Sequence, residues 1–182
     1  MRRLVPPFVS ISILSLTVGC GQADSTAFAD VSDKSAEELA ATELPQLGEA
    51  PSWALRRLDG TELNSAELAG KIVVLDFWAT WCGPCRQEIP GYVAMQRELE
   101  ADGVVIVGVS LDQAGPSVVS DFAERFGINY PLVMGNQKIV GAFGGVEAIP
   151  TTFLIDRDGQ VRYRKVGAMA RSEFEPLVRS LL

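Results

Sequence analysis

The sequence contains no histidine in its 182 residues and only three cysteines. Without histidine, the chain lacks every catalytic triad, haem attachment site or metal site that needs an imidazole. Three cysteines are too few for a disulfide-rich scaffold, and two alone do not complete a tetrahedral zinc site. The chain has 16 Lys and Arg against 23 Asp and Glu, so it has no basic stripe for nucleic acid. We expect no metal, no bound cofactor and no nucleic-acid partner.

The N-terminus has the pattern of a secretory signal peptide over residues 1–19. Two arginines precede an apolar run that is short for a membrane span and contains two early prolines. The run ends at Gly19-Cys20, which resembles the lipobox of bacterial lipoproteins, where the cysteine is lipidated and becomes the mature N-terminus. The alternative is an ordinary secretory signal with an incidental cysteine. We favour lipidation of Cys20, because an unpaired cysteine after a small residue is otherwise hard to explain there.

The rest of the chain divides into a linker and one domain. Residues 20–44 begin with the cysteine and continue as a small, polar and acidic stretch, which predicts a flexible linker. Residues 45–182 contain the long apolar runs, and the 47% hydrophobic content can fill a core. We therefore expect an extracytoplasmic, periplasm-facing domain that a lipid on Cys20 anchors to a membrane.

Two nearly continuous apolar runs, residues 71–78 and 103–111, predict strands buried on both faces of a sheet. Shorter patterns surround them: a hairpin with a helical turn, a helix after the first strand, a second helix, a short strand, a short helix, a hairpin and a last helix. Apart from the helix that starts near Cys82, these cover residues 51–70, 116–127, 130–134, 137–145, 151–166 and 171–182. Strands that alternate with helices and end in a hairpin predict an α/β fold, with a central mixed β-sheet flanked by helices on both faces.

Local signals give two finer predictions for the helices. In the segment 116–127, helical spacing places Val118, Phe122 and Phe126 on one apolar face. In the last helix, Ser172 and Glu175 have the spacing of a capping box.

The pair Cys82 and Cys85 lies where the first buried strand meets a helix. Such a pair can hold a metal, form a static disulfide or carry electrons. The chain supplies too few ligands for the first, and so small a loop constrains the unfolded chain little, which disfavours the second. Cys82 at a helix N-terminus favours a thiolate that attacks a partner's disulfide, and Cys85 then resolves the mixed disulfide. Gly83 permits close approach, and Pro84 suits the first turn of the helix.

Two carboxyl groups are candidates for redox tuning and proton transfer. Asp76 lies inside an apolar strand, where burial would raise its pKa; the alternative is an edge charge or a bond to backbone. Glu88 follows Cys85 by three residues and so shares its helical face, although an ordinary surface glutamate would have the same spacing.

A proline and a tryptophan complete the candidate site. Pro150 directly precedes a predicted strand. If the Ile149–Pro150 peptide bond is cis and lies beside the cysteines, the backbone of Ile149 is free to pair with an incoming peptide. The alternative is an ordinary trans proline at the start of a strand. Trp81 adjoins the cysteine pair and is expected to shield it. Trp78 and Trp53 are expected in the core.

The segments FWATWCGPC and IPTTFLIDRDG together resemble the thioredoxin superfamily, and more closely its membrane-anchored TlpA/ResA-like thiol-disulfide oxidoreductases. The resemblance covers residues 51–182. It implies a thioredoxin fold with an N-terminal hairpin extension and an insertion after the C-x-x-C helix. It also implies that Cys82 and Cys85 are the redox cysteines and that Pro150 is the cis-proline. Asp76 matches the buried aspartate of thioredoxin and Glu88 the glutamate of the ResA-like branch, so the chain mixes two patterns.

The resemblance implies an enzyme whose only redox group is the Cys82–Cys85 disulfide. We expect a monomeric reductase of protein disulfides that takes electrons from a membrane thiol donor, with cytochrome c maturation or envelope thiol homeostasis as its role. A net disulfide oxidant is the first alternative. A peroxiredoxin-like peroxidase and a non-catalytic assembly or binding module are two others.

Overall fold

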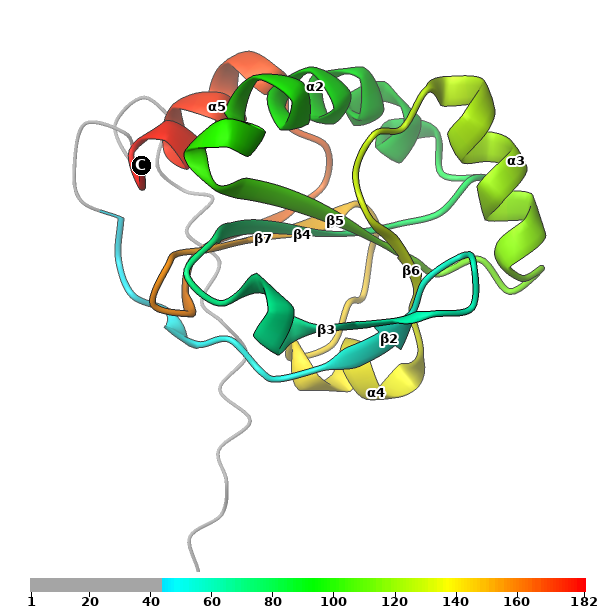
Figure 1. Ribbon diagram of the computed structural model, residues 1–182, viewed down its shortest axis with the longest axis horizontal. Coiled ribbons are helices and arrows are strands. Elements are labelled where there is room, and N and C mark those ends of the chain that lie inside the picture. Colours follow the sequence, from blue (N-terminus) through cyan, green and yellow to red (C-terminus); the bar gives the residue numbers. More distant parts are fainter. Residues whose placement is uncertain (1–43) are drawn as a thin grey trace, which may run out of the picture.

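The computed structural model describes residues 44–182 of the chain. The predicted signal peptide, the proposed lipidation of Cys20 and nearly all of the predicted linker lie outside the described residues. Figure 1 shows the described part as a central sheet with helices on both sides.

The central sheet has six strands in the order β1-β8-β7-β4-β5-β6. β4, β5 and β6 are parallel, whereas β7 is antiparallel to β4, β8 to β7 and β1 to β8. The sheet is therefore mixed, as predicted. Its strands are β1 (Gly48–Glu49), β4 (Ile72–Trp78), β5 (Val104–Ser110), β6 (Leu132–Met134), β7 (Thr151–Ile155) and β8 (Gln160–Val166).

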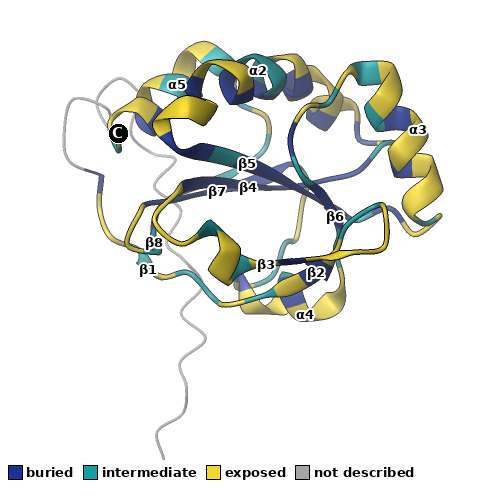
Figure 2. Cartoon of the chain, viewed as in Figure 1, coloured by how far each residue is buried: buried dark blue, intermediate teal, exposed yellow. Residues whose placement is uncertain are grey.

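Every residue of β4 is buried, because this strand lies between two hydrophobic clusters (Figure 2). Ile72, Val74 and Trp78 face the first cluster, and Val73, Leu75 and Phe77 face the second. Successive side chains of a strand point to opposite faces, so this near-continuous run of β-branched and aromatic residues fills both cores at once.

Helices α2 (Gly83–Leu99), α3 (Pro116–Phe126) and α5 (Arg171–Arg179) cover one face of the sheet (Figure 1). The short helix α4 (Gln137–Ala142) and the hairpin of β2 (Ala54–Arg56) and β3 (Glu62–Asn64) cover the other. Two 3-10 turns, η1 (Ser65–Leu68) and η2 (Glu100–Asp102), complete the elements. The expected central mixed sheet with helices on both faces is confirmed. The expected hairpin, β2 and β3, lies between β1 and β4 in the chain, and α3 and β6 form the segment expected after the C-x-x-C helix.

Two local predictions are wrong. Val118 is 41% exposed, and its neighbour Val119 is buried instead, because the buried stripe of α3 begins one residue later. The capping box at Ser172 does not form: α5 already begins at Arg171, and Glu173 accepts a hydrogen bond from the Ala170 N–H at 3.3 Å.

A buried ion pair holds the start of the described chain. The Arg162 guanidinium pairs with Asp156 at 2.9 Å and donates to the carbonyl of Leu44 at 3.0 Å. Leu44 is itself buried in the first cluster, and β1 extends the sheet beside β8. None of the helices within residues 44–182 combines the length and the apolar character that a membrane crossing requires.

Candidate active site

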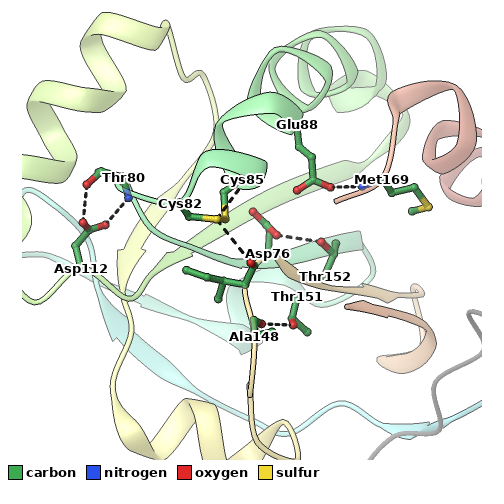
Figure 3. Close-up of a disulfide and its surroundings, with 11 residues drawn as sticks. Asp76, Thr80, Cys82, Cys85, Glu88, Asp112, Ala148, Thr151, Thr152 and Met169 are labelled. Atoms are coloured by element: carbon green, nitrogen blue, oxygen red, sulfur yellow. Dashed lines mark hydrogen bonds between the residues drawn. A yellow bond between two sulfur atoms is a disulfide. The ribbon is translucent and has the colours of Figure 1, made fainter. Parts of the chain in front are cut away.

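Cys82 and Cys85 form a disulfide at the junction of β4 and α2 (Figure 3). Cys82 is the N-cap of α2, and its Sγ accepts a hydrogen bond from the Cys85 N–H at 3.2 Å. Pro84 occupies the first turn, where a missing N–H costs nothing. The free N–H groups and the positive end of the helix dipole therefore point toward Cys82, and they favour a thiolate there.

The two cysteines are nearly buried, at 5% exposure for Cys82 and 2% for Cys85. Trp81 is 69% exposed, so its own side chain is open to solvent, and the shielding of the cysteines by Trp81 stays a prediction. Trp78 lies in the core as expected, and Trp53 is partly buried against the second cluster. The disulfide is thus enclosed by core side chains, with an exposed tryptophan immediately before it.

The Ile149–Pro150 peptide bond is cis, as the resemblance implies. The carbonyl oxygen of Ile149 lies 3.7 Å from Cys82 Sγ. The Thr151 hydroxyl donates to the Ala148 carbonyl at 2.7 Å and braces this turn. A backbone segment that is only partly buried therefore lies directly beside the first cysteine.

Asp76 lies on the face of β4 that α2 covers, and it is 5% exposed. Burial raises its pKa to about 7, although the Thr152 hydroxyl donates to Oδ1 at 3.0 Å and opposes the rise. The Tyr92 and Thr152 hydroxyls are 3.1 Å apart, so two hydroxyl groups lead to this carboxyl. Burial raises the pKa of Tyr92 well above its ordinary value, and Tyr92 therefore stays neutral.

Glu88 is 7% exposed, which excludes an ordinary surface glutamate. Oε1 accepts a hydrogen bond from the Met169 N–H at 2.8 Å, whereas the buried Oε2 has no hydrogen-bond partner within the described residues. Burial raises the pKa of Glu88 to about 8, and the neighbouring charge of Asp76 adds to the rise. The structure thus places two carboxyl groups that titrate near neutral pH on the α2 side of β4.

Comparison with known proteins identifies the family. Residues 48–164 match the model of the AhpC/TSA family. The chain belongs to the AhpC/TSA family. The thiol-disulfide oxidoreductase ResA of Geobacillus kaustophilus is 37% identical over 132 residues, which are 72% of this chain and 75% of that protein. ResA of Bacillus anthracis is 33% identical over 138 residues, 75% and 79% of the two chains.

The chain also resembles solved structures of thioredoxin-family proteins. A thiol:disulfide interchange protein of the thioredoxin family from Chlorobium tepidum has a TM-score of 0.69 and 33% identity, and the match covers 77% of this chain and 99% of that one. The fold is thioredoxin-like, and the protein is a thiol-disulfide oxidoreductase.

The sequence alone did not reveal three residues that form hydrogen bonds with residues of the site. Thr152 and Met169 bind the two carboxyl groups from β7 and from the loop before α5, far away in the sequence. Asp112, just after β5, binds Thr80 in the loop that leads to the cysteines. For Asp112, the sequence offered one signal: a carboxyl directly after a buried strand is expected at the carboxyl edge of the sheet, where functional groups of such folds gather. In the described part of the chain, no cluster of three or more His, Cys, Asp or Glu could hold a metal ion.

Proposed function

We propose that this thiol-disulfide oxidoreductase works as an extracytoplasmic reductase of protein disulfides, with Cys82 as nucleophile and Cys85 as resolving cysteine. The observation that carries the proposal is the setting of the disulfide. One backbone N–H donates to Cys82 Sγ, and two buried carboxyl groups, those of Asp76 and Glu88, lie around the disulfide (Figure 3). Strong oxidants of this class owe their potential to a highly stabilised thiolate. An acidic, buried setting has the opposite effect and favours electron donation.

The exchange proceeds in two balanced steps. The Cys82 thiolate attacks one sulfur of the substrate disulfide; the substrate S–S bond breaks, and the leaving sulfur takes up a proton as a thiol. Cys85 then loses its proton and attacks Cys82 Sγ, so that the mixed disulfide breaks and the second substrate thiol is released. Two electrons pass from the chain's dithiol to the substrate, and the Cys82–Cys85 disulfide remains.

Asp76 and Glu88 are proposed to receive the proton of Cys85. Glu88 lies one helical turn after Cys85, and its charge is coupled to that of Asp76 below the helix. Acid–base groups transfer protons best when their pKa lies near the working pH, and values of about 7 and about 8 meet that condition.

The substrate is proposed to be an extended polypeptide with an accessible disulfide or cysteine pair. The backbone beside Ile149 lies next to Cys82, so a peptide bonded to Cys82 can pair there as an added strand. Cytochrome c precursors and other envelope proteins are the proposed substrates. Trp81, exposed beside Cys82, offers an apolar contact for the same peptide.

The location and partners form part of the proposal. The signal peptide would export the chain, and a lipid on Cys20 would anchor it as a monomer to a membrane, facing the periplasm. That compartment is oxidising, so a membrane thiol donor must reduce the Cys82–Cys85 disulfide after each turnover. No bound cofactor enters this cycle. A net oxidant would run the same steps in reverse.

Trapping of the mixed disulfide tests the proposal. A Cys85→Ser variant cannot resolve, so we expect it to accumulate a one-to-one mixed disulfide with a reporter peptide that contains a disulfide. The Cys82→Ser variant, the matched control, should form none. The reduced wild-type protein should release two peptide thiols per molecule. Trapping through Cys85 alone would overturn the assigned roles. Rapid consumption of hydrogen peroxide without peptide reduction would favour a peroxidase, and retained partner binding without exchange would favour a scaffold.

A further inference from the structure

Asp112 is a buried acid that the steps above do not use. It follows β5 at the carboxyl edge of the sheet and is 8% exposed. Oδ2 accepts a hydrogen bond from the Thr80 N–H at 2.9 Å, and Oδ1 accepts from the Thr80 hydroxyl at 2.6 Å (Figure 3). Oδ2 also accepts from the Ser110 hydroxyl at 2.9 Å. Both oxygens thus act as acceptors, which is what an ionised carboxylate requires.

These bonds fix the turn that leads to the nucleophile. β4 and β5 end side by side, with Trp78 opposite Ser110, and the Leu111 N–H donates to the Trp78 carbonyl at 2.8 Å. Beyond that pair the chain turns, and the Cys82 N–H closes the turn on the Ala79 carbonyl at 3.1 Å. Thr80 lies inside this turn. Asp112 therefore connects the end of β5 to the turn that precedes Cys82 at the start of α2.

The charge of Asp112 has no cationic partner in the described part of the chain, since its contacts there are with neutral donors. Thr80 precedes Cys82 by two residues, a backbone span of at most about 7 Å. A buried charge bonded to the turn that leads to the nucleophile is weakly screened. A carboxylate there repels the thiolate of Cys82 and opposes the helix dipole, which stabilises it.

We propose that Asp112 is a positioning residue for disulfide exchange: it clamps the Thr80 turn beneath Cys82, and its negative charge makes the reduced couple a stronger electron donor. The inference rests on the proposed role of Cys82 as the nucleophile. Reduction of the disulfide breaks one S–S bond, takes up two electrons and one proton, and leaves a thiolate on Cys82 and a thiol on Cys85. A charge that destabilises this thiolate disfavours the reduced form, so the electrons are given up more readily.

Two substitutions separate the clamp from the charge. Asp112→Asn retains the shape: its amide oxygen can accept from the Thr80 N–H, and its amide NH₂ can donate to the Thr80 hydroxyl. Thr80→Val retains the charge but loses the bond of 2.6 Å. The exposed Asp102, at the far end of α2, provides a control for the loss of one negative charge from the surface.

The test is the redox equilibrium of the wild type, Asp112→Asn, Thr80→Val and Asp102→Asn proteins with glutathione at pH 7. We expect Asp112→Asn to favour the reduced form three- to tenfold, where tenfold corresponds to about 30 mV. Thr80→Val should slow peptide reduction without any shift toward the reduced form, and Asp102→Asn should match the wild type.

The outcomes separate this inference from the proposed function. If the wild type exchanges with glutathione but Asp112→Asn has the same equilibrium, the role of Asp112 is wrong and the proposed function stands. A shift toward the reduced form in both Asp112→Asn and Thr80→Val would mean that general loosening of the turn is responsible, and would also overturn the role of the charge. A wild-type couple that does not exchange would overturn both.

Discussion

The Asp76→Asn variant of the oxidised protein is expected to have a higher free energy of unfolding than the wild type at pH 8. This difference should disappear in acid. Burial raises the pKa of Asp76 from 3.8 to about 7. A carboxyl with a raised pKa holds its proton more tightly in the folded chain than in the unfolded one, so folded stability falls as pH rises through the interval between the two values. The penalty is small below pH 3.8, grows up to about pH 7 and is complete above it.

The width of that interval sets the size of the effect. The pKa rises by about three pH units, and each unit corresponds to about 1.4 kcal/mol, so the full penalty is about 4 kcal/mol. Asparagine has the same shape and no charge, and its amide oxygen can accept the hydrogen bond from Thr152. Its buried NH₂ group needs a hydrogen-bond acceptor, and the cost of leaving it without one reduces the stabilisation. Between pH 4 and pH 8, we therefore expect the advantage of Asp76→Asn in the free energy of unfolding to increase by about 2 to 4 kcal/mol.

The assay is guanidinium unfolding of the oxidised proteins from pH 4 to pH 9. Asp158→Asn is the control, because Asp158 lies in the exposed turn between β7 and β8 and should show no such trend. A difference between wild type and Asp76→Asn that does not change with pH would refute the account of Asp76 as a buried acid. So would a variant that is less stable than the wild type at pH 8.

Three further predictions concern the same core. Thr152→Val should raise the pKa of Asp76 above about 7, because the hydroxyl that donates to it at 3.0 Å is lost; carbon-13 NMR titration checks this, and Thr152→Ser should restore the wild-type value. Glu88→Gln should stabilise the oxidised protein at pH 9 but not at pH 4 in the same unfolding assay, because burial raises the pKa of Glu88 from 4.5 to about 8. Gly108→Ala should lower the unfolding free energy by about 1 to 3 kcal/mol, because its Cβ would lie 2.5 Å from a side-chain carbon of β6. Gly141→Ala, with nothing within 4 Å of the new atom, should not be destabilising, and equal losses in both variants would contradict the packing argument.

The strands and the position of the cysteines could be predicted because their signals are local. The run of β4 is apolar on both faces, so its burial follows from the sequence alone. The same run makes the burial of Asp76 predictable. Its partner Thr152 was not predictable, since it depends on the antiparallel register of β7 against β4.

Glu88 shows where spacing stops being informative. Its place one turn after Cys85 fits both a surface glutamate and a buried one. The outcome depends on the loop before α5, whose Met169 N–H covers one carboxyl oxygen. The spacing of Ser172 and Glu175 is likewise compatible with more than one arrangement. In the structure α5 begins at Arg171, before Ser172, and Glu175 forms an ion pair with Arg171 at 2.6 Å instead of a capping box.

The measurement that tests the central claim most directly is the reduction potential of the Cys82–Cys85 couple in residues 44–182, equilibrated against thiol buffers of known ratio. The account predicts a reducing couple, near or below the value of about −270 mV for thioredoxin. A potential near the value of about −120 mV for DsbA would contradict it. The protein would then insert disulfides into reduced exported chains, and its partner would be a re-oxidising enzyme rather than an electron donor.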